Sequence, residues 1–507
     1  MHSAWLHKVL PAVAVLAMVI GLAAISGCDK SSSSKEGQGQ QGQQGQEGVI
    51  TASGGQPTKP KAEPEPNPAD LSTGTTTLGE GKPSDDKAAW PQFRGANRDG
   101  IAADAKGLLR TWPADGPKTL WSIDLLGEGY AGPAVCAGKV YFEDYDKPNS
   151  LWMMRCVSLA DGKEIWRWSY RRLITPNHAI TRAVPAVDEK YVVQVDPMCV
   201  LHGFDAATGK RLWAHDLTTE FRTVIPQWYS GQCPLIDGDR VIVGIGGKDV
   251  LLAAFDKATG KVLWTTPNTD KRRLSHSSVM PMTLCGRKQF VWCTMPGPGN
   301  PVGAVVGVDA ADGSPLWSGP ADAAGKVDWK PSTAVGPSMV PVPGDRVFVT
   351  SGYNVGSVMM KIEQADGKFV AKSLVKLKDT EFASGCHTPI VWSDHLFAVN
   401  EEGAAFTCVD FDGKVDWESP AAAVKEPRKG FELGCFILAD GMFYIVEGTS
   451  GRLHLVEASA SGWKELAVAD GLLAGGEVWA PMALVNGKLL CRDLKKLLCL
   501  QVGAADK

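Results

Sequence analysis

A unit of 45 to 56 residues recurs eight times along this chain of 507 residues, and it constrains the fold more than any other feature. Each unit starts with a proline, or in one copy with Phe436, and continues as a short apolar strand, a turn and a second apolar strand. Examples are "GPAVCAGKVYF", "VPAVDEKYVVQ" and "APMALVNGKLLC". Two further short strands are expected in each unit, and this period with four strands is typical of a β-propeller blade.

A second motif lies between these strand pairs and contributes to an unusual tryptophan content, 17 Trp against 8 Tyr. One copy reads "FDKATGKVLW". We expect its aspartate to accept backbone N–H bonds, its glycine to take a positive φ, and its tryptophan to pack between blades. A turn and packing element needs no cofactor, whereas the alternative is a cofactor signature. The motif residues are Asp205, Gly209, Trp213, Asp256, Gly260, Trp264, Asp309, Gly313, Trp317, Asp410, Gly413 and Trp417, with Trp166 in a looser copy.

The count of strands predicts how the ring closes. The eighth unit ends with the strand "LLCLQV", so its outermost strand is missing. An unassigned strand, "TLWSIDLL" around Trp121, precedes the first unit. We therefore predict an all-β, eight-bladed propeller over residues 117–503, whose last blade is completed by this N-terminal strand. Closure of this kind removes exposed sheet edges. Residues 89–116 are expected to pack on the propeller.

The N-terminus has the features of an export signal. A basic start precedes the apolar run from Val9 to Ile25, and the sequence "ISGC" ending at Cys28 matches a lipoprotein cleavage site. We predict a lipoprotein signal peptide over residues 1–27, with the membrane reached through acyl chains on Cys28. The alternative is a short transmembrane anchor. Residues 28–88 are low in complexity and are expected to form a lipidated, disordered linker.

Charge and cysteine usage argue against two classes of site. The net charge is −4 and no dense Lys/Arg cluster occurs, so no nucleic-acid partner is expected. The 12 cysteines include no adjacent pair, and Cys408 occupies a motif position where other copies have a small residue. A disulfide between Cys491 and Cys499 remains open. The 9 histidines are scattered, and no metal site is expected.

The residues directly before the inner strands are more polar and more aromatic than the rest of each unit. In a propeller these residues form one rim of the central channel. They predict a pocket for a ligand or partner at the channel mouth. The alternative is a hydrated rim that satisfies only its own backbone, and no catalytic residue can be assigned. The candidates are Glu128, Tyr130, His178, Arg182, Trp228, Tyr229, His276, Ser277, His387, Glu432, Glu477 and Trp479.

The repeats resemble those of the PQQ-like (pyrroloquinoline quinone) β-propeller family over about residues 117 to 502. The segment "WPQFRGANRDGIA", from Trp90 to Ala102, looks like the opening of PQQ-repeat proteins of planctomycetes. Within this family, resemblance to quinoprotein alcohol dehydrogenases implies PQQ, calcium, a vicinal disulfide and a catalytic aspartate. This chain has no adjacent cysteines, and no position matches the calcium ligands or that aspartate. Resemblance to BamB-like bacterial lipoproteins implies a propeller without a cofactor, and the lipobox, linker and propeller share that layout.

These observations favour a monomeric binding scaffold, exported and lipid-anchored at a periplasm-facing membrane surface of the bacterial cell envelope. It would bind a protein or another ligand, in a BamB-like envelope role, without quinone chemistry and without a cofactor. Two alternatives remain. The first is a PQQ- and calcium-dependent alcohol or aldehyde dehydrogenase. The second is a module that binds a carbohydrate or cell-wall polymer through Trp228, Tyr229 and Trp479.

Overall fold

The computed structural model describes residues 70–504, apart from residues 114, 301, 322–328, 332, 401–403 and 421–429. The predicted signal peptide, Cys28 and most of the predicted linker lie outside the described residues. Within the described part, no helix has the length and apolar character needed to cross a membrane.

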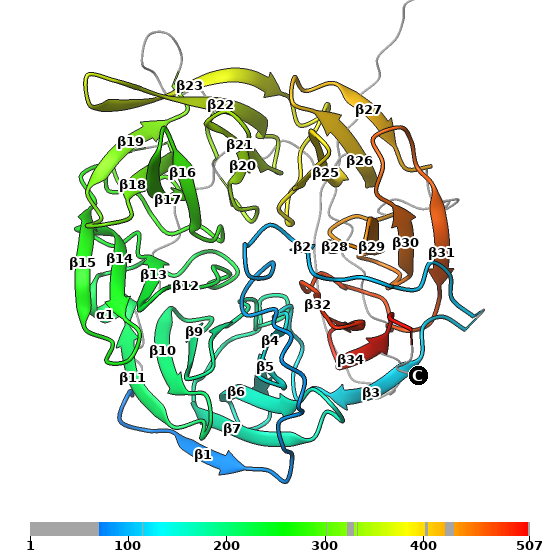
Figure 1. Ribbon diagram of the computed structural model, residues 1–507. Helices are drawn as coiled ribbons and strands as arrows, with labels where there is room; N and C mark the ends of the chain where they lie inside the picture. Colours follow the sequence, from blue (N-terminus) through cyan, green and yellow to red (C-terminus); the bar gives the residue numbers. More distant parts are fainter. Residues whose placement is uncertain are drawn as a thin grey trace, which may run out of the picture. The chain divides into compact units, whose positions relative to one another are not determined.

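Eight largely antiparallel sheets, the blades, are arranged in a ring around a central channel (Figure 1). The predicted eight-bladed, all-β propeller is thereby confirmed. In each blade the repeat start lies in, or shortly before, the first strand of the unit, and proline is tolerated there because it has no N–H to donate to a neighbouring strand. Within the described residues there is a single short helix, α1 (Leu217–Glu220), which is capped by the Asp216 carboxylate.

Blades 1 to 4 contain the following strands, given from the channel outward. Blade 1 has β4 (Ala134–Cys136), β5 (Lys139–Asp146), β6 (Leu151–Ser158), β7 (Glu164–Arg171) and β1 (Thr75–Leu78). Blade 2 has β8 (Ala186–Val187), β9 (Tyr191–Val195), β10 (Val200–Asp205) and β11 (Arg211–Asp216). Blade 3 has β12 (Leu235–Asp237), β13 (Arg240–Gly244), β14 (Val250–Asp256) and β15 (Val262–Pro267). Blade 4 has β16 (Met280–Leu284), β17 (Arg287–Cys293), β18 (Val305–Asp309) and β19 (Pro315–Gly319).

Blades 5 to 8 follow the same plan, with N-terminal strands added to the last two. Blade 5 has β20 (Val340–Val342), β21 (Arg346–Ser351), β22 (Gly356–Ala365) and β23 (Lys368–Leu377). Blade 6 has β24 (Ile390–Trp392), β25 (His395–Asn400), β26 (Ala405–Asp410) and β27 (Val415–Glu418). Blade 7 has β2 (Ile101–Ala102), β28 (Phe436–Ala439), β29 (Met442–Val446), β30 (Leu453–Glu457) and β31 (Glu465–Ala469). Blade 8 has β32 (Ala483–Val485), β33 (Lys488–Arg492), β34 (Lys496–Gln501) and β3 (Thr119–Asp124).

The ring closes through β3, which pairs antiparallel with β34 in a register that places Ser122 opposite Leu498 (Figure 1). The predicted closure of the last blade by an N-terminal strand is confirmed. The Trp121 indole of this strand donates to the Leu159 carbonyl of blade 1 at 3.0 Å. The first and last blades are thus joined by the same strand that completes the sheet.

The tryptophan motif forms the contact between neighbouring blades. In the turn of blade 3, one oxygen of Asp256 accepts from the Thr259 backbone N–H at 2.8 Å and from its hydroxyl at 2.7 Å. Gly260 has a φ of 74°, and a Cβ there would lie 2.7 Å from Trp213 of blade 2. Only glycine fits at this position, because it has no Cβ to strain the left-handed backbone or to clash with the indole of Trp213.

The N-terminal strand β1 corrects the predicted extent of the linker, which does not reach residue 88 as a disordered segment. Thr75–Leu78 pairs antiparallel with β7 along its full length, with Thr76 opposite Trp168. The local sequence is polar and gives no strand signal, but the outer edge of blade 1 offers unpaired backbone groups to it. Tertiary pairing therefore decides the structure here.

All cysteines of the described residues are free thiols, and most are buried. The pair Cys491 and Cys499 sits in adjacent strands, but Cys491 is opposite Leu498 and Cys499 is opposite Leu490. Because successive side chains of a strand point to opposite faces, the two sulfurs lie on different sides of the sheet. The disulfide that the sequence left open does not form.

Candidate functional site

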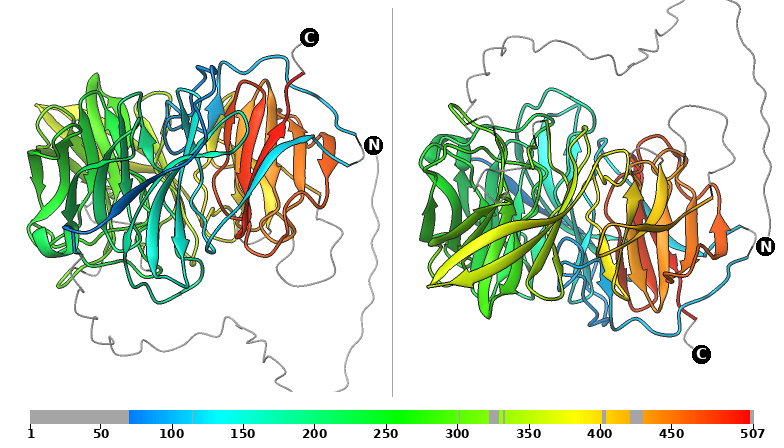
Figure 2. Two further views of the ribbon diagram at one scale, coloured as in Figure 1. Left: turned by 90° about the horizontal axis from the view of Figure 1, so that it is seen from below. Right: turned by 90° about the horizontal axis from the view of Figure 1, so that it is seen from above.

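Residues 90–102, here called the plug, lie inside the ring at one face of it (Figure 2). The backbone of Trp90 forms a bridge with Val135 of blade 1, and the Pro91 carbonyl accepts from Val187 of blade 2 at 2.7 Å. Further along, β2 pairs in parallel with β28 of blade 7. Trp90, Arg94 and Arg98 are buried, whereas Ala96 and Asn97 are exposed, so the plug packs against the inner strands with one turn facing solvent.

Two arginines of the plug reach backbone carbonyls of distant blades. Arg94 donates to the carbonyls of Thr388 at 2.5 Å and Pro389 at 2.8 Å in blade 6. Arg98, which is fully buried, donates to the Pro234 carbonyl of blade 3 at 2.9 Å. Burial lowers the pKa of Arg94 to about 9 and that of Arg98 to about 10. Both guanidinium groups remain charged at neutral pH and hold inner strands together by charge-assisted hydrogen bonds.

A belt of hydrogen bonds connects the inner strands of blades 2 to 6 next to the plug. The backbone N–H of each member donates to a side-chain atom of the following member. The belt members are Val184, Cys233, Ser278, Ser338 and Thr388. The three N–H···O bonds measure 2.8 to 3.1 Å, and the bond to the Cys233 sulfur measures 3.2 Å. The belt satisfies backbone donors that a channel wall would otherwise leave unpaired.

A cavity of about 260 Å³ lies at the channel mouth, and every blade contributes to it. Most of its wall comes from the residues that precede the inner strands, as the sequence predicts for the rim. Phe93 of the plug also lines it, so the plug closes one side of the cavity. The lining residues are Phe93, Tyr130, His178, Arg182, Trp228, Gly231, Cys233, His276, Ser278, Ala334, Gly336, Tyr353, Gly385, Cys386, His387, Leu433, Trp479 and Pro481.

Two pairs of stacked aromatic rings contribute to this wall. Tyr130 stacks on Trp479 with ring centroids 5.1 Å apart and an interplanar angle of 25°. Trp228 stacks on Tyr353, which comes from the turn between β21 and β22, at 5.8 Å and 22°. The cavity therefore presents flat apolar surfaces of the kind that bind planar groups.

Several residues at the mouth adopt a left-handed backbone conformation. The φ angles are 64° at Trp228, 70° at Tyr229 and 59° at Tyr353, and His178 has 60°. These are bulky residues, for which positive φ is unfavourable by about 1–3 kcal/mol each. Of the three described tryptophans and tyrosines with positive φ, Trp228 and Tyr353 line the cavity, and Tyr229 directly follows Trp228. Backbone strain of this kind concentrates where a protein positions side chains for binding.

The polar groups of the mouth pair mostly with one another. The Tyr130 hydroxyl donates to Glu477, whose other oxygen lies 3.6 Å from Nδ1 of His178. Burial and then the bond to Glu477 raise the pKa of Tyr130 far above its usual range. The Arg182 guanidinium lies 4.9 Å from the centre of the Tyr130 ring and donates to the Trp228 and Asn177 carbonyls. Arg182 thus supplies the positive charge at this side of the wall.

Two histidines of the wall are neutral at neutral pH. Burial, and next the charge of Arg182, lower the pKa of His276 to about 4. Burial, and next the charge of Arg94, lower the pKa of His387 to about 4 as well. The plug therefore affects the mouth electrostatically, because Arg94 is one of its residues.

The twelve rim candidates do not all meet. Those that line the cavity are Tyr130, His178, Arg182, Trp228, His276, His387 and Trp479. Glu477 touches it through Tyr130 and His178, whereas Glu128 is exposed and lines a separate cavity near Lys495. Tyr229 turns away and donates to the Thr175 carbonyl. Ser277 is buried with its hydroxyl 3.9 Å from the Met339 sulfur, and Glu432 is outside the lining although its neighbour Leu433 belongs to it.

The three rim carboxylates do not provide a calcium site for a quinone cofactor. Calcium takes six to eight oxygen ligands, mostly carboxylates. Glu128, Glu432 and Glu477 do not form a group whose ligand atoms converge, and the one such cluster in the described residues lies in blade 6. The cavity wall consists of aromatic rings, imidazoles and a guanidinium, so its chemistry does not fit calcium-bound PQQ.

Sequence reasoning missed Phe93, Tyr353 and Cys386 as lining residues. Phe93 lies in the plug, and nothing in its local pattern says that it faces the channel. Tyr353 lies in "SGYNVG", a turn between two strands of one blade, where the repeat offers no equivalent residue. Cys386 stands in "SGCHTP" directly before the inner strand of blade 6, so its position could have indicated it.

Comparisons with known proteins agree with this architecture. A comparison with curated proteins gives no match. Among solved structures, a europium-containing methanol dehydrogenase shares 13% identity at a TM-score of 0.53, covering 80% of this chain and 89% of its own. The quinohemoprotein alcohol dehydrogenase from Comamonas testosteroni shares 13% at 0.52, covering 83% and 81%. BamB from Moraxella catarrhalis shares 14% at 0.48, covering 76% and 99%.

These structural likenesses concern the fold alone. The sequence profile of a family described as outer membrane protein assembly factor BamB matches residues 153–419 and 303–460. The first match by itself covers more than half of the chain and spans the repeats of several blades. The chain therefore belongs to this family of PQQ-like repeat β-propellers.

Proposed function

We propose that this protein is a binding scaffold that captures one ring-shaped group of a partner at its channel mouth, without quinone chemistry. The observation that carries the proposal is the set of strained aromatic residues at the mouth, Trp228 and Tyr353 above all. Each holds a positive φ at a cost in stability, and the two rings stack on each other against the cavity.

The size of the cavity limits what it can take. A volume of about 260 Å³ is smaller than that of most small-molecule sites, but it accommodates a single aromatic or sugar ring. Aromatic-walled pockets of this kind hold the anchor residue of a protein partner, which contributes most of the binding energy. We therefore favour a protein partner that inserts one planar side chain. A polymer with ring-shaped units is the competing outcome of the test below.

A photocrosslinking amino acid at position 353 tests this proposal in cells that produce the full chain. We expect a discrete crosslinked adduct that is sensitive to protease and disappears when Trp228 or Trp479 is replaced by Ala. The same crosslinker at Asp366, on the tip of the β22–β23 hairpin, is the matched control. Equal adducts from both positions, or none from position 353, contradict a specific mouth. An adduct that resists protease and yields to a glycosidase identifies a polymer.

The absence of quinone chemistry has its own test. The full chain is reconstituted with PQQ and Ca²⁺ and assayed for dye-linked oxidation of alcohols and aldehydes. We expect no activity above that of the Glu477→Gln variant, because the carboxylate is already bound to Tyr130. Turnover that is lost on Glu432→Gln or Glu477→Gln contradicts this proposal and supports a dehydrogenase.

We propose further that the propeller is exported and anchored to a membrane through lipid on Cys28. Two observations support this proposal: the lipobox sequence that ends at Cys28, and membership of the family described as outer membrane protein assembly factor BamB. Cys28→Ala should release the protein from the membrane fraction to the soluble extracytoplasmic fraction. Retention of that variant in the membrane contradicts lipid anchoring at this residue.

A further inference from the structure

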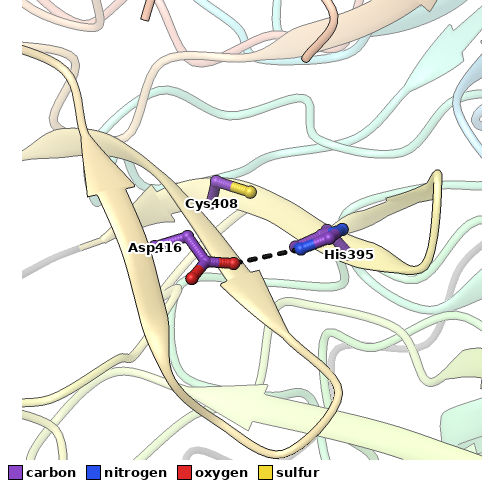
Figure 3. A group of neighbouring side chains, drawn as sticks. All are labelled: His395, Cys408 and Asp416. Carbon is purple, nitrogen blue, oxygen red and sulfur yellow. Dashed lines mark hydrogen bonds and ion pairs between the residues drawn. The ribbon is translucent and has the colours of Figure 1, made fainter. Parts of the chain in front are cut away.

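Three side chains in blade 6 converge on one point (Figure 3). His395 lies on β25, Cys408 on β26 and Asp416 on β27. One ligand atom from each, a ring nitrogen, the thiol sulfur and a carboxylate oxygen, lies within 4.8 Å of the others. The Nε2 atom of His395 and an oxygen of Asp416 are 3.0 Å apart.

Strand register explains how the three groups meet. Phe397 is opposite Cys408, and His395 lies two residues earlier on β25, so His395 and Cys408 point to the same face of the sheet. Between Trp417 and Val415 the pairing of β27 with β26 shifts by one residue, and Asp416 is the extra residue of this β-bulge. A bulge re-aims one side chain, which here turns the carboxylate toward the imidazole.

The same bulge recurs once in every blade, in β7, β11, β15, β19, β23, β27, β31 and β3, and blade 6 departs from the others at this position. The bulge residue is leucine or isoleucine in the seven other blades. These residues are Leu120, Ile165, Leu212, Leu263, Leu316, Leu374 and Leu466. Asp416 is the single carboxylate among the eight. Blade 6 also differs at the first residue of β25, where His395 is paired with Asp410, the last residue of β26. The corresponding residues of blades 1 and 3 are Lys139 and Arg240.

Hydrogen bonds from outside the cluster fix the imidazole of His395 and the carboxylate of Asp416, as is usual for residues that bind a metal. Nδ1 of His395 lies 2.6 Å from the Ser393 carbonyl, which can only accept, so Nδ1 carries a proton and Nε2 faces the other two groups. The second oxygen of Asp416 accepts from Lys414 at 2.6 Å, which fixes the carboxylate. A backbone carbonyl behind the imidazole and a cation behind the carboxylate are the usual outer contacts of such ligands.

We propose that His395, Cys408 and Asp416 form a binding site for a zinc-class divalent cation, with a fourth position open to solvent. Nitrogen, sulfur and carboxylate ligands together suit Zn²⁺, whereas Mg²⁺ and Ca²⁺ require oxygen ligands alone. The thiol is fully buried, and the side chains of His395 and Asp416 each retain 21% of their exposure, so the site is accessible from one side. A bound ion would link β25, β26 and β27 of blade 6 to one another through one side chain from each.

The repeat itself supplies the variants that test the site in the full chain. Asp416→Leu restores the residue found in other blades, and Cys408→Ala places there the residue that blade 3 has as Ala254. Cys156→Ala is the matched control, because Cys156 is equally buried and stands opposite Trp166 as Cys408 stands opposite Trp417. Each protein is stripped with a chelator under reducing conditions, loaded with Zn²⁺ and desalted, and the bound metal is counted.

After desalting we expect one tightly held Zn²⁺ in the unmodified chain and in Cys156→Ala, and about tenfold less retained zinc in Cys408→Ala and Asp416→Leu, because loss of a ligand weakens a site at least as much as loss of an outer partner of a ligand. Loading with Co²⁺ should produce a thiolate charge-transfer band that Cys408→Ala lacks. Equal zinc content in all four proteins, or no retained zinc in the unmodified chain, overturns the proposal. The second result would leave a proton, and not a metal, between His395 and Asp416.

Discussion

The indole of Trp213 in blade 2 lies against Gly260, the turn glycine of blade 3, and donates to the Lys257 carbonyl of the same turn at 3.0 Å. Gly209 packs in the same way against Trp166, Gly313 against Trp264 and Gly162 against Trp121. At these four blade junctions, the indole of one blade therefore packs on the turn glycine of the next.

Replacing Gly260 by alanine should destabilise the propeller by about 3 kcal/mol. The methyl group meets the Trp213 ring and also strains a backbone at φ 74°. Gly238→Ala separates the two effects, because Gly238 has a φ of 63° with open space around it and should cost only about 1–2 kcal/mol. Denaturant unfolding of both variants measures the difference. Equal losses would show that the indole contact contributes nothing.

Arg94→Lys should destabilise the protein by about 2–4 kcal/mol, because a lysine cannot span the carbonyls of Thr388 and Pro389 and would leave acceptors unpaired. Arg110→Lys is the control, since Arg110 donates to the Asp440 carbonyl at an exposed site. Thermal unfolding should show a lower Tm for Arg94→Lys alone. A similar Tm for the two variants contradicts a role of the plug in holding the inner strands.

Stability should fall when the pH is lowered from about 6.5 toward 4. His276 and His387 have folded-state pKa values of about 4, below the ordinary value of 6.5. In this window the unfolded chain binds more protons than the folded one, so the two histidines contribute stability above pH 6.5 that is lost on acidification. His387→Gln should flatten the dependence of Tm on pH by roughly a few degrees across the window. A slope unchanged in this variant contradicts the assignment.

Tyr353→Gly should keep or raise the stability of the propeller while it removes the partner contact of the Tyr353 ring at the mouth. Glycine accepts the φ of 59° without strain, whereas Tyr353→Ala keeps the strain and loses the ring. We therefore expect the free energy of unfolding of the glycine variant to exceed that of the alanine variant by about 1 kcal/mol. The glycine variant should accordingly have the higher Tm. An alanine variant as stable as the glycine variant would show that the backbone here is not strained.

The fold could be predicted from sequence because its information is local and repeated. The proline-led strands and the Asp-Gly turns before Trp213, Trp264 and Trp317 specify strand number and blade number without any knowledge of distant contacts. The strand around Trp121 was identified by counting what the last blade lacked. In contrast, β1 reads as polar linker, and only the open edge of β7 makes it a strand.

The site was predictable in part for a related reason. Residues before each inner strand face the channel wherever the repeat holds, which brings Tyr130, His178 and Trp479 into one cavity wall. Tyr353 and Phe93 come from a turn and a plug outside the repeat, and no period indicates where they lie.

The blade 6 cluster could not be predicted from sequence even though its residues lie within the repeat. Cys408 occupies a position that accepts any small residue, and its meaning depends on Asp416 and His395 in other strands.

The N-terminal stretch described here makes contact with six of the eight blades, through β1, Pro91, Arg98, Arg94, β2 and β3. In an open array of repeats a terminal unit can fray while the others stay folded. In this ring, loss of any of these blades also removes a contact of the stretch that the remaining blades share. The molecule, although built from near-equivalent units, should melt in one cooperative step, and β3 must wait for the last-made strand, β34, before the circle is complete.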